Sequence, residues 1–392
     1  MSDLRFNFGL FRLKIAKTIV RIIPKNKKLV ICGAWFGNKY ADNSMYVYEY
    51  LLLNSDYEVY WITKDKTIFK SLQAKDKPVL NWYSWKAKWK QMRAAALFSA
   101  VQFSDFNQFF VSNSIQIDLG HGHPIKDPGE ITSNPKVLKL NNLYLRHLHY
   151  YAVVAGKTGK EDYHNVVPIP DDHIIMSDFA RNDAFIYPEL RAGKNEAVDV
   201  LKKGHKAIIY MPTHRSQGQI VMNMHKLLPL DEIEKFCEKE GWEFIIKKHF
   251  YHKNEHEDFS QYKHIHDISE MNDIEPQTLL YQAEVLISDY SACYIDYLLL
   301  NRPLMFYHYD IKDFEEKERH LYFDFGKLDI CPIAYDKEGF MSVLEKICLS
   351  PADEYSAKRN AFIPTYFANS PQKDGRAKVK AILDKLIKQY YS

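Results

Sequence analysis

Polar residues that could do chemistry gather in short clusters, and each cluster directly follows a run with the pattern of a strand. Ile115–Leu119 leads into HGHPIK, Ala207–Tyr210 into MPTHR, Glu243–Ile246 into KKH, and Glu284–Ser288 into DYS. Short apolar runs predict buried strands, and the carboxyl ends of parallel strands share one edge of a sheet. Imidazole, ammonium and hydroxyl groups favour an anionic partner. The clusters therefore predict a site for a phosphate-bearing ligand.

One histidine in these clusters has the surroundings of a general base. His121 stands between two glycines, so no Cβ atom beside it hinders its approach to a reacting hydroxyl. Ser291 opens a predicted helix, where its hydroxyl and the neighbouring amides could bind a phosphate, and Arg215 and Lys247 could neutralise the remaining charge. The other candidate contacts in the clusters are Gly122, His123, Lys126, Thr213, His214 and Asp289.

The same residues have ordinary alternatives. A histidine after a strand can be a satisfied loop residue, Lys248 and His214 can simply be solvated, and Asp289 can cap a helix. Asp171, Asp172 and His173 look like metal ligands but fit a turn after a proline. Neither G-x-x-x-x-G-K-[ST] nor G-x-G-x-x-G after a strand occurs, which disfavours a P-loop or a dinucleotide fingerprint.

The elements that must position these clusters alternate between strand and helix patterns from residue 28 onward. This alternation predicts α/β layers around parallel sheets. We expect a segment at residues 1–27, an α/β domain at 28–190 and a second α/β domain at 191–392, which closes with an amphipathic helix over Asp374–Tyr390. Other expected elements are strands at Leu29–Gly33, Glu58–Thr63, Leu97–Val101 and Pro303–Tyr307, and helices at Ser44–Leu53, at Leu230–Glu240 and from Ala292.

Composition bounds the function. The chain has 392 residues, of which 46% are hydrophobic and 26% charged, as in an ordinary soluble globular protein. Lys and Arg number 53 against 50 Asp and Glu, so no global basic field indicates nucleic acid. The 5 cysteines lie far apart without a C-x-x-C pair, which disfavours a zinc ribbon and fits reduced thiols.

The N-terminal segment is basic and apolar together. Residues 1–28 carry 8 Lys and Arg side chains against one acid, Asp3, and the basic residues interrupt an apolar stretch too often for a signal peptide or a span. Two readings stay open: an amphipathic helix on an anionic membrane, or a surface helix docked on the protein's own core. A second basic and aromatic stretch, Trp82–Arg93, could add to a membrane-facing patch.

In their order, these motifs resemble the CDP-glycerol glycerophosphotransferase family, which includes wall teichoic acid primases and polymerases and their capsule relatives. The matching segments are HGHPIK at 121–126, SDFARND at 177–183, PTHR at 212–215, KKHF at 247–250 and SDYSACYIDYLLLNRPLMFYHYD at 288–310. The resemblance extends over roughly residues 28–385, and the 288–310 block is its most specific part.

The resemblance implies a GT-B-like α/β fold of two Rossmann-like domains with the active site in the interdomain cleft. It implies transfer of a polyol phosphate from a CDP-activated donor to a hydroxyl of a lipid-linked saccharide or polyol-phosphate acceptor, with release of CMP, in teichoic acid or capsule synthesis. Glycerol phosphate is the first expectation and ribitol phosphate the alternative. No cofactor, metal or nucleic acid is implied. The enzyme is expected at the cytoplasmic face of the membrane, held peripherally.

By the same resemblance, His121 would be the base that deprotonates the acceptor. His249, with Arg215 and Ser291, would stabilise the phosphates and the departing CMP. Arg181, Asp183 and Asp296 are carried over as substrate-binding residues, and residues 28–190 and 191–392 as the acceptor and donor domains.

Several positions depart from the family pattern: His123, Asp178, Ala180, Phe250 and Ala292 replace Thr, Gly, Pro, Pro and Ser. The two histidines and the arginine remain, which predicts an active enzyme with altered substrate choice. The chain's length favours priming or short-chain transfer, and a compact capsule polymerase stays open as the alternative.

Three rival functions remain. A metal-dependent hydrolase could use His121 and His123 as an H-x-H pair, together with Asp118, Asp127, His249 and Asp289. A glycosyltransferase or epimerase on the same fold would bind UDP instead of CDP. A scaffold without turnover would keep the fold and the basic helix.

Overall fold

The computed structural model describes residues 3–123, 134–249, 252, 255–271, 273–317, 327–369 and 373–391. The chain divides into two compact units. Unit 1 consists of Met1–His121, Pro128–Asp183 and Phe367–Ser392, and unit 2 of Gly122–Asp127 and Ala184–Tyr366.

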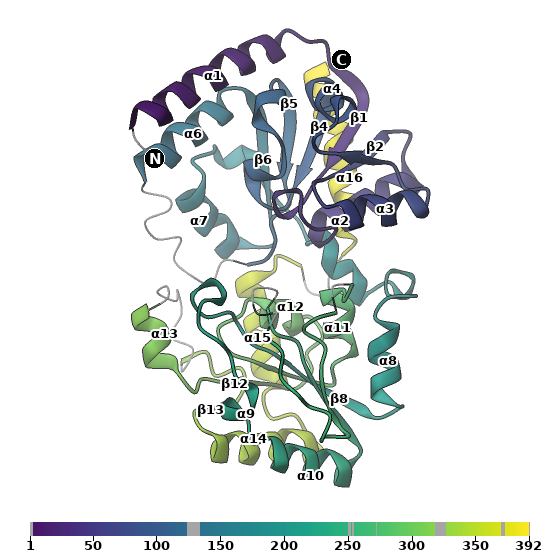
Figure 1. The fold of residues 1–392 in the computed structure, drawn as a ribbon, viewed down its shortest axis with the longest axis vertical. Coiled ribbons are helices and arrows are strands. Elements are labelled where there is room, and N and C mark those ends of the chain that lie inside the picture. Colours follow the sequence, from purple (N-terminus) through teal and green to yellow (C-terminus); the bar gives the residue numbers. More distant parts are fainter. Residues whose placement is uncertain are drawn as a thin grey trace. The chain divides into compact units, whose positions relative to one another are not determined.

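Unit 1 is built on a parallel sheet of 7 strands in the order β3-β2-β1-β4-β5-β6-β7 (Figure 1). Its strands are β1 (Asn26–Cys32), β2 (Glu58–Thr63), β3 (Val79–Asn81), β4 (Ala94–Ser99), β5 (Ser114–Asp118), β6 (Leu148–Val154) and β7 (Ile174–Met176). All residues of β4 and β5 are buried, as expected of central parallel strands covered on both faces. The strand order reverses between β1 and β4, so the loops that follow β1, β4 and β5 meet at one edge of the sheet.

The helices of unit 1 form where the sequence supplies caps and apolar faces. The Asp65 carboxylate accepts the Thr67 and Ile68 amides at the start of α3, and the Ser84 hydroxyl accepts the Ala87 amide at the start of α4. The helices are α1 (Asp3–Arg21), α2 (Asp42–Asn54), α3 (Lys66–Ala74), α4 (Trp85–Arg93), α6 (Pro135–Leu145), α7 (Lys157–Val166) and α16 (Gly375–Tyr391), with short 3-10 turns η1 (Trp35–Gly37), η2 (Gln102–Asp105), η3 (Gln108–Phe110), η4 (Asp171–His173) and η5 (Ala180–Phe185).

Unit 2 repeats the design with a parallel sheet of 6 strands in the order β10-β9-β8-β11-β12-β13. Its strands are β8 (Lys206–Met211), β9 (Trp242–Ile246), β10 (Ile265–Asp267), β11 (Val285–Ser288), β12 (Leu304–Tyr307) and β13 (Ile333–Ala334). Its helices are α8 (Glu196–Lys202), α9 (Met224–Leu227), α10 (Leu230–Glu240), α11 (Pro276–Gln282), α12 (Cys293–Leu298), α13 (Ile311–Lys317), α14 (Lys337–Leu349) and α15 (Ser356–Tyr366), with turns η6 (Pro188–Leu190) and η7 (Ser216–Gly218).

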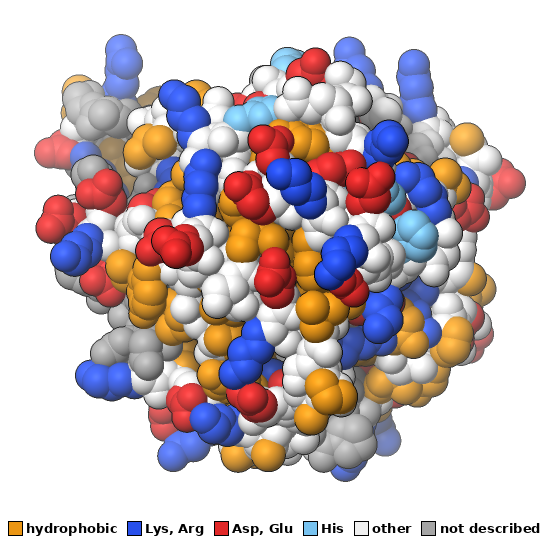
Figure 2. Space-filling view, turned by 90° about the horizontal axis from the view of Figure 1, so that it is seen from below, with side chains coloured by type: hydrophobic (Ala, Val, Ile, Leu, Met, Phe, Trp, Pro, Cys, Tyr) orange, Lys and Arg blue, Asp and Glu red, His pale blue; other side chains and the backbone are white. Residues whose placement is uncertain are grey.

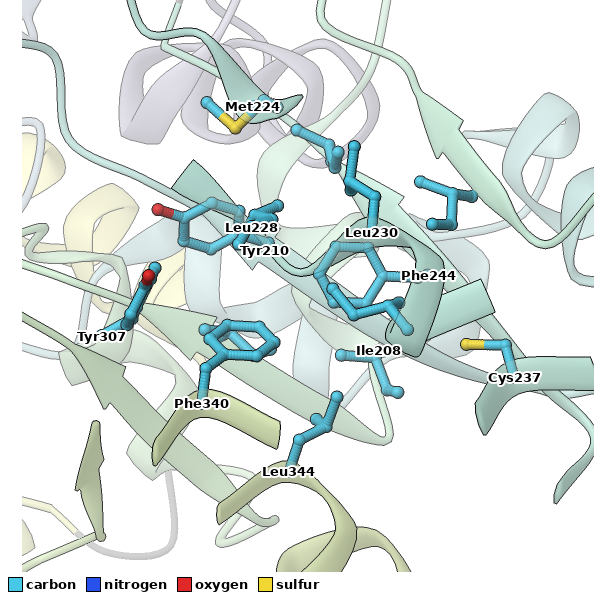
Figure 3. Close-up of a cluster of buried hydrophobic side chains, with 14 of the residues drawn as sticks. Ile208, Tyr210, Met224, Leu228, Leu230, Cys237, Phe244, Tyr307, Phe340 and Leu344 are labelled. Atoms are coloured by element: carbon cyan, nitrogen blue, oxygen red, sulfur yellow. The ribbon is translucent and has the colours of Figure 1, made fainter. Parts of the chain in front are cut away.

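The core of unit 2 lies between its sheet and helices α10 and α14. Figure 3 shows Phe340 of α14 between Tyr307 of β12 and Phe244 of β9. The Phe340 ring centroid lies 6.4 Å from that of Phe244 and 4.9 Å from that of Tyr307, both edge-on. Such edge-to-face contacts add to the burial of apolar area that holds the helix on the sheet.

These two parallel sheets confirm the expected GT-B-like α/β class, but the C-terminal helix differs from the expected division. We predicted a boundary at residues 190 and 191 with the closing helix in the second domain, whereas contacts separate the units between Asp183 and Ala184 and place α16 in unit 1. The physical reason is local. The Asp183 carboxylate accepts the backbone amides of Gly375 and Arg376, at 2.9 and 3.0 Å, and so caps α16.

The charges follow the balanced composition. Figure 2 shows a face of the molecule on which Lys and Arg side chains are interspersed with Asp, Glu and apolar ones. No helix in the described part of the chain is both long enough and apolar enough to cross a bilayer.

Candidate functional site

The candidate base His121 follows β5 on an exposed turn of unit 1. Gly120 has a φ of 65° and Gly122 a φ of 143°, conformations that a residue with a Cβ atom adopts at a cost. The two glycines therefore allow the chain to turn sharply at this point, and the turn presents the His121 imidazole to solvent.

The tautomer of His121 is fixed by one contact. Its Nδ1 lies 2.9 Å from the Ala100 carbonyl oxygen. A carbonyl oxygen only accepts hydrogen bonds, so Nδ1 carries a proton, and Nε2 is the nitrogen left to exchange a proton with a substrate. A neutral imidazole with a basic Nε2 and an exposed side chain is the form that a general base requires.

Three hydrogen-bonded residues, Trp35, Asp42 and Arg181, hold the His121 loop in place. Nη1 of Arg181 donates to the Asp42 carboxylate at 2.7 Å and to the His121 carbonyl at 2.8 Å. The Trp35 indole donates to the other Asp42 oxygen at 2.7 Å, and its ring centroid lies 5.1 Å from that of His121. Trp35 and Asp42 adopt positive φ values of 49° and 64°, which is strained for these residue types. Arg181 is thus a positioning residue in this structure.

A buried carboxylate, Asp118, lies at the end of β5 close to the loop. One of its oxygens accepts hydrogen bonds from the Tyr163 and Tyr150 hydroxyls, at 2.7 and 3.2 Å. Burial raises the pKa of Asp118, while the hydrogen bonds from Tyr163 and Gly120 and the nearby charge of His121 act to lower it. An ionised Asp118 would therefore stabilise a protonated His121.

The predicted histidines of unit 2 come together. His214 follows β8 and His249 follows β9, and their ring centroids are 4.9 Å apart. Next to His214, the Thr213 amide donates to Asp289 at 2.7 Å, while the buried Thr213 hydroxyl has no hydrogen-bond partner within the described part of the chain. Two imidazoles and an available hydroxyl at adjacent strand ends can bind phosphate oxygens.

Arg215 lies in the same region but is not exposed to solvent. Its guanidinium donates to Asp289 at 3.0 Å and to both Asp310 oxygens, at 2.8 and 3.0 Å, and its side chain is 6% exposed. It also donates to the Thr213 carbonyl at 2.7 Å. Burial alone would lower the pKa of Arg215, but the two carboxylates raise it. The residue joins the loops that follow β8, β11 and β12.

The lysine predicted to neutralise phosphate charge is also engaged. Lys247 donates to three backbone carbonyls, those of Ile268, Ser269 and Met271, at 3.2, 3.3 and 2.9 Å. Burial lowers its pKa. The ammonium group therefore ties the loop after β10 to the end of β9.

Other predicted residues have structural partners. Asp183 caps α16 and also accepts from the Arg376 side chain at 2.9 Å. Asp296 is buried in α12 and accepts from Gln277 at 3.0 Å. The Ser291 hydroxyl accepts the Cys293 amide at 3.4 Å near the start of α12, consistent with its expected place at a helix start.

The remaining residues of HGHPIK are partly described. Gly122 is half-buried and His123 is buried, with its ring centroid 5.3 Å from that of Tyr366. Lys126 and Asp127 lie outside the described residues, as does Phe250. Among the described residues, neither His121 nor His123 belongs to a group of three potential metal ligands, so the hydrolase alternative gains no support.

Sequence reasoning missed the residues that hold the base in place. Trp35, Asp42 and Tyr163 were not among the predicted contacts, and Asp118 was considered only as a possible metal ligand. The position of Asp118 at the end of a predicted strand, beside the HGHPIK cluster, was the available signal.

Two parallel α/β units, each with polar side chains after its strand ends, give the chain a GT-B-like architecture. The family described as CDP-glycerol:poly(glycerophosphate) glycerophosphotransferase matches residues 15–386. The chain belongs to this family, as its motifs predicted, and it is a transferase of the polyol-phosphate type.

Two relatives and one solved structure illustrate the similarity. A teichoic acid glycerol-phosphate transferase of Staphylococcus aureus is 25% identical over 365 residues, 88% of this chain and 90% of the relative. A teichoic acid poly(glycerol phosphate) polymerase of Bacillus spizizenii is 25% identical over 84% of this chain and 86% of its own. The wall teichoic acid polymerase TagF has the same fold, with a TM-score of 0.75 and 21% identity over 99% of this chain and 98% of that chain.

Proposed function

We propose that the enzyme transfers glycerol phosphate from CDP-glycerol to a hydroxyl group of a lipid-linked saccharide or polyol-phosphate acceptor. The names of the relatives above support glycerol over ribitol, although ribitol-phosphate polymerases also match, at 25% identity over 61% and 62% of the chain. The observation that carries the proposal is the His121 turn, which presents an exposed imidazole whose Nδ1 faces the Ala100 carbonyl and whose Nε2 is left for the acceptor hydroxyl.

The bonds change as follows. Nε2 of His121 takes the proton of the acceptor hydroxyl while that oxygen attacks the phosphorus that bears glycerol. The new P–O bond forms as the bond to CMP breaks, and CMP leaves with the electron pair. Asp118 favours the imidazolium that forms, and the proton then passes to solvent. Such a transfer depends on positioning and charge neutralisation and needs no enzyme nucleophile.

Unit 2 supplies the donor side of the proposal. His214, His249 and the Thr213 hydroxyl contact the diphosphate, and protonation of either imidazole neutralises charge on the departing CMP. The Arg215 guanidinium is already paired with Asp289 and Asp310. Arg215 therefore positions the loops that carry the phosphate-binding groups and does not contact the phosphate itself. Residues of unit 1 bind the acceptor.

A nucleotide-release assay tests the reaction. CDP-glycerol, CDP-ribitol and a UDP-sugar are each offered with a short polyol-phosphate acceptor, and CMP or UDP is quantified. We expect CMP from CDP-glycerol, only when the acceptor is present. CMP from CDP-ribitol alone would change the polyol, whereas UDP release, or silence with every donor, would overturn the proposal.

The N-terminal helix supports peripheral attachment to the cytoplasmic face of a membrane. One side of α1 is docked: Leu13 and Val20 are buried, and Lys17 donates to Gln108 and to the Val111 carbonyl, at 3.0 and 2.8 Å. A second row of apolar side chains, spaced to lie on one side of the helix, is exposed: Leu4 81%, Phe8 63%, Phe11 60%, Ile15 46% and Ile19 57%. One side of α1 therefore docks on the protein, as the second reading of the sequence expected. The exposed apolar row, flanked by Arg and Lys, suits an anionic lipid surface, as the first reading expected.

Vesicle sedimentation tests this attachment. Phe8→Glu combined with Phe11→Glu should abolish binding to phosphatidylglycerol vesicles and leave activity on a soluble acceptor unchanged, because neither side chain is buried. Leu53→Glu, at an 85% exposed leucine of α2, is the matched control and should bind normally. Undiminished pelleting of the double variant would refute the membrane role of α1.

A further inference from the structure

Three histidines converge on one buried glutamate in unit 2, at the end of the sheet opposite to the proposed donor groups. Glu243 lies in β9 and is fully buried, within a strand that is otherwise apolar. Ala207 of β8 is the register partner of Glu243, and His205 lies just before the start of β8. On the other side, β10 pairs with β9, with His266 opposite Ile245.

The contacts are short and divided between the two carboxylate oxygens. Oε1 of Glu243 lies 2.9 Å from Nδ1 of His205 and 3.1 Å from Nδ1 of His264. Oε2 lies 2.8 Å from Nε2 of His266. Lys203 approaches Oε1 at 3.7 Å with a side chain that is 50% exposed.

The electrostatics of this cluster favour a cation. The Glu243 side chain is fully buried, and a buried carboxylate is costly unless it is paired or coordinated. The Lys203 ammonium, which lies 3.7 Å away on a half-exposed side chain, pairs with it only weakly.

The ligand atoms also have the spacing that a metal needs. The ligating atoms of His205, Glu243 and His264 all lie within 4.8 Å of one another. Tetrahedral zinc with bonds of about 2.0–2.1 Å separates its ligand atoms by about 3.3 Å. The contacts of His205 and His264 with Glu243, at 2.9 and 3.1 Å, are near that spacing. Each neutral imidazole can shift its proton from Nδ1 to Nε2, which frees the Nδ1 lone pair without a net loss of protons.

We propose that His205, Glu243 and His264 form a binding site for a divalent transition metal, of which zinc is the best match to two imidazoles and one carboxylate. His266 is a positioning residue that holds the second carboxylate oxygen, as hydrogen-bond partners of metal ligands commonly do. The His205 side chain is 39% exposed, which gives the ion a path from solvent.

The site has a structural role. It joins the starts of β8 and β9 to the edge strand β10, which is only 3 residues long. The proposed phosphate-binding groups follow the other ends of β8 and β9, so the metal takes no part in transfer. The inference is independent of the proposed function, because binding of zinc is measured without any nucleotide.

Metal titration of the tag-free, full-length protein tests the site. After dialysis against a chelator, zinc is added in competition with a chromophoric chelator and the bound metal is counted by mass spectrometry. Cobalt(II) then serves as the spectroscopic probe. We expect one zinc ion per chain, visible cobalt bands of tetrahedral intensity, and a rise in Tm with zinc, because a ligand that binds only the folded state stabilises it.

Variants decide which residues bind. His205→Gln, at a half-exposed position before β8, and Glu243→Gln should each lower zinc affinity by at least about 100-fold, and His266→Ala by about 10- to 100-fold. His256→Gln is the matched control, since His256 is an exposed histidine of unit 2 whose Nδ1 lies 2.5 Å from Glu270. Substoichiometric zinc, or affinity unchanged in His205→Gln, would overturn the proposal, even if Glu243→Gln fails to fold.

Discussion

The candidate sites of the two units differ in whether their main basic side chain is exposed to solvent or buried. In unit 1, His121 is exposed and its loop is held by buried or half-buried neighbours. In unit 2, Arg215 is buried and neutralised by Asp289 and Asp310. The difference teaches that a motif residue can be essential either because it contacts substrate or because it holds other groups that do. Four predictions test that distinction, from the largest expected effect to the smallest.

His121→Ala should lower the rate of transfer by about 10²- to 10⁴-fold, the range for loss of a general base. Binding of the CDP donor, measured by calorimetry, should be unchanged because the base acts on the acceptor. His164→Ala, at another histidine of unit 1, which lies 2.9 Å from Asp171, is the control and should keep full activity. Donor binding lost together with activity would contradict the assignment.

Arg215→Met should reduce the free energy of unfolding by roughly 3–5 kcal/mol, because it leaves the buried Asp289 and the half-buried Asp310 without their cation. Urea denaturation measures the loss. Arg302→Met is the comparison: Arg302 donates to two backbone carbonyls, those of Tyr281 and Ala283, and should cost less. If Arg215→Met instead folds with normal stability and loses donor binding, Arg215 contacts phosphate directly.

Acid should weaken the Arg215 region through His308. Burial lowers the pKa of His308 from 6.5 to about 4. Between these values the unfolded chain binds more protons than the folded one, so stability rises with pH across this window and is lost as the pH falls through it. The full loss is at most about 3 kcal/mol.

His308→Phe isolates this contribution, because phenylalanine preserves stacking on Tyr290 and Phe306. Urea midpoints measured from pH 7 to pH 4 should fall less steeply in the variant than in the natural protein. Equal slopes would show that His308 titrates normally in the folded state.

Arg181→Lys should lower kcat about tenfold and leave KM for the donor unchanged. A lysine has one point charge and cannot hold both Asp42 and the His121 carbonyl in the geometry of a guanidinium. The steady-state split between kcat and KM measures the effect. A change confined to KM for the acceptor would assign Arg181 to substrate binding and would contradict its role as a positioning residue.

Much of the fold could be predicted because strands such as β9, β11 and β12 are apolar at nearly every position. Glu58–Thr63 and Leu230–Glu240 coincide with β2 and α10, and the predicted strand ends locate His121, His214 and His249. Strands such as β3 and β13, with 3 and 2 residues, carry too little periodicity to be recognised.

The functions of individual charges could not be predicted, because they depend on partners far away in sequence. Arg215 lies 95 residues from Asp310, and Asp183 lies 192 residues from Gly375. A motif shows which residue types are present but not whether a cation meets a substrate or a carboxylate. The same limit applies to Glu243 of β9, whose three histidines come from the starts of two other strands, β8 and β10.

The return of α16 to unit 1 has a consequence for synthesis. Residues 184–366 make up almost all of unit 2 and leave the ribosome before residues 367–391, so this sheet can form while unit 1 still lacks a helix that covers α2. Unit 1 becomes complete only when Gly375 and Arg376 reach the waiting Asp183 carboxylate. In a nascent chain all residues of unit 2 are therefore synthesised before unit 1 receives α16, the helix that Asp183 caps.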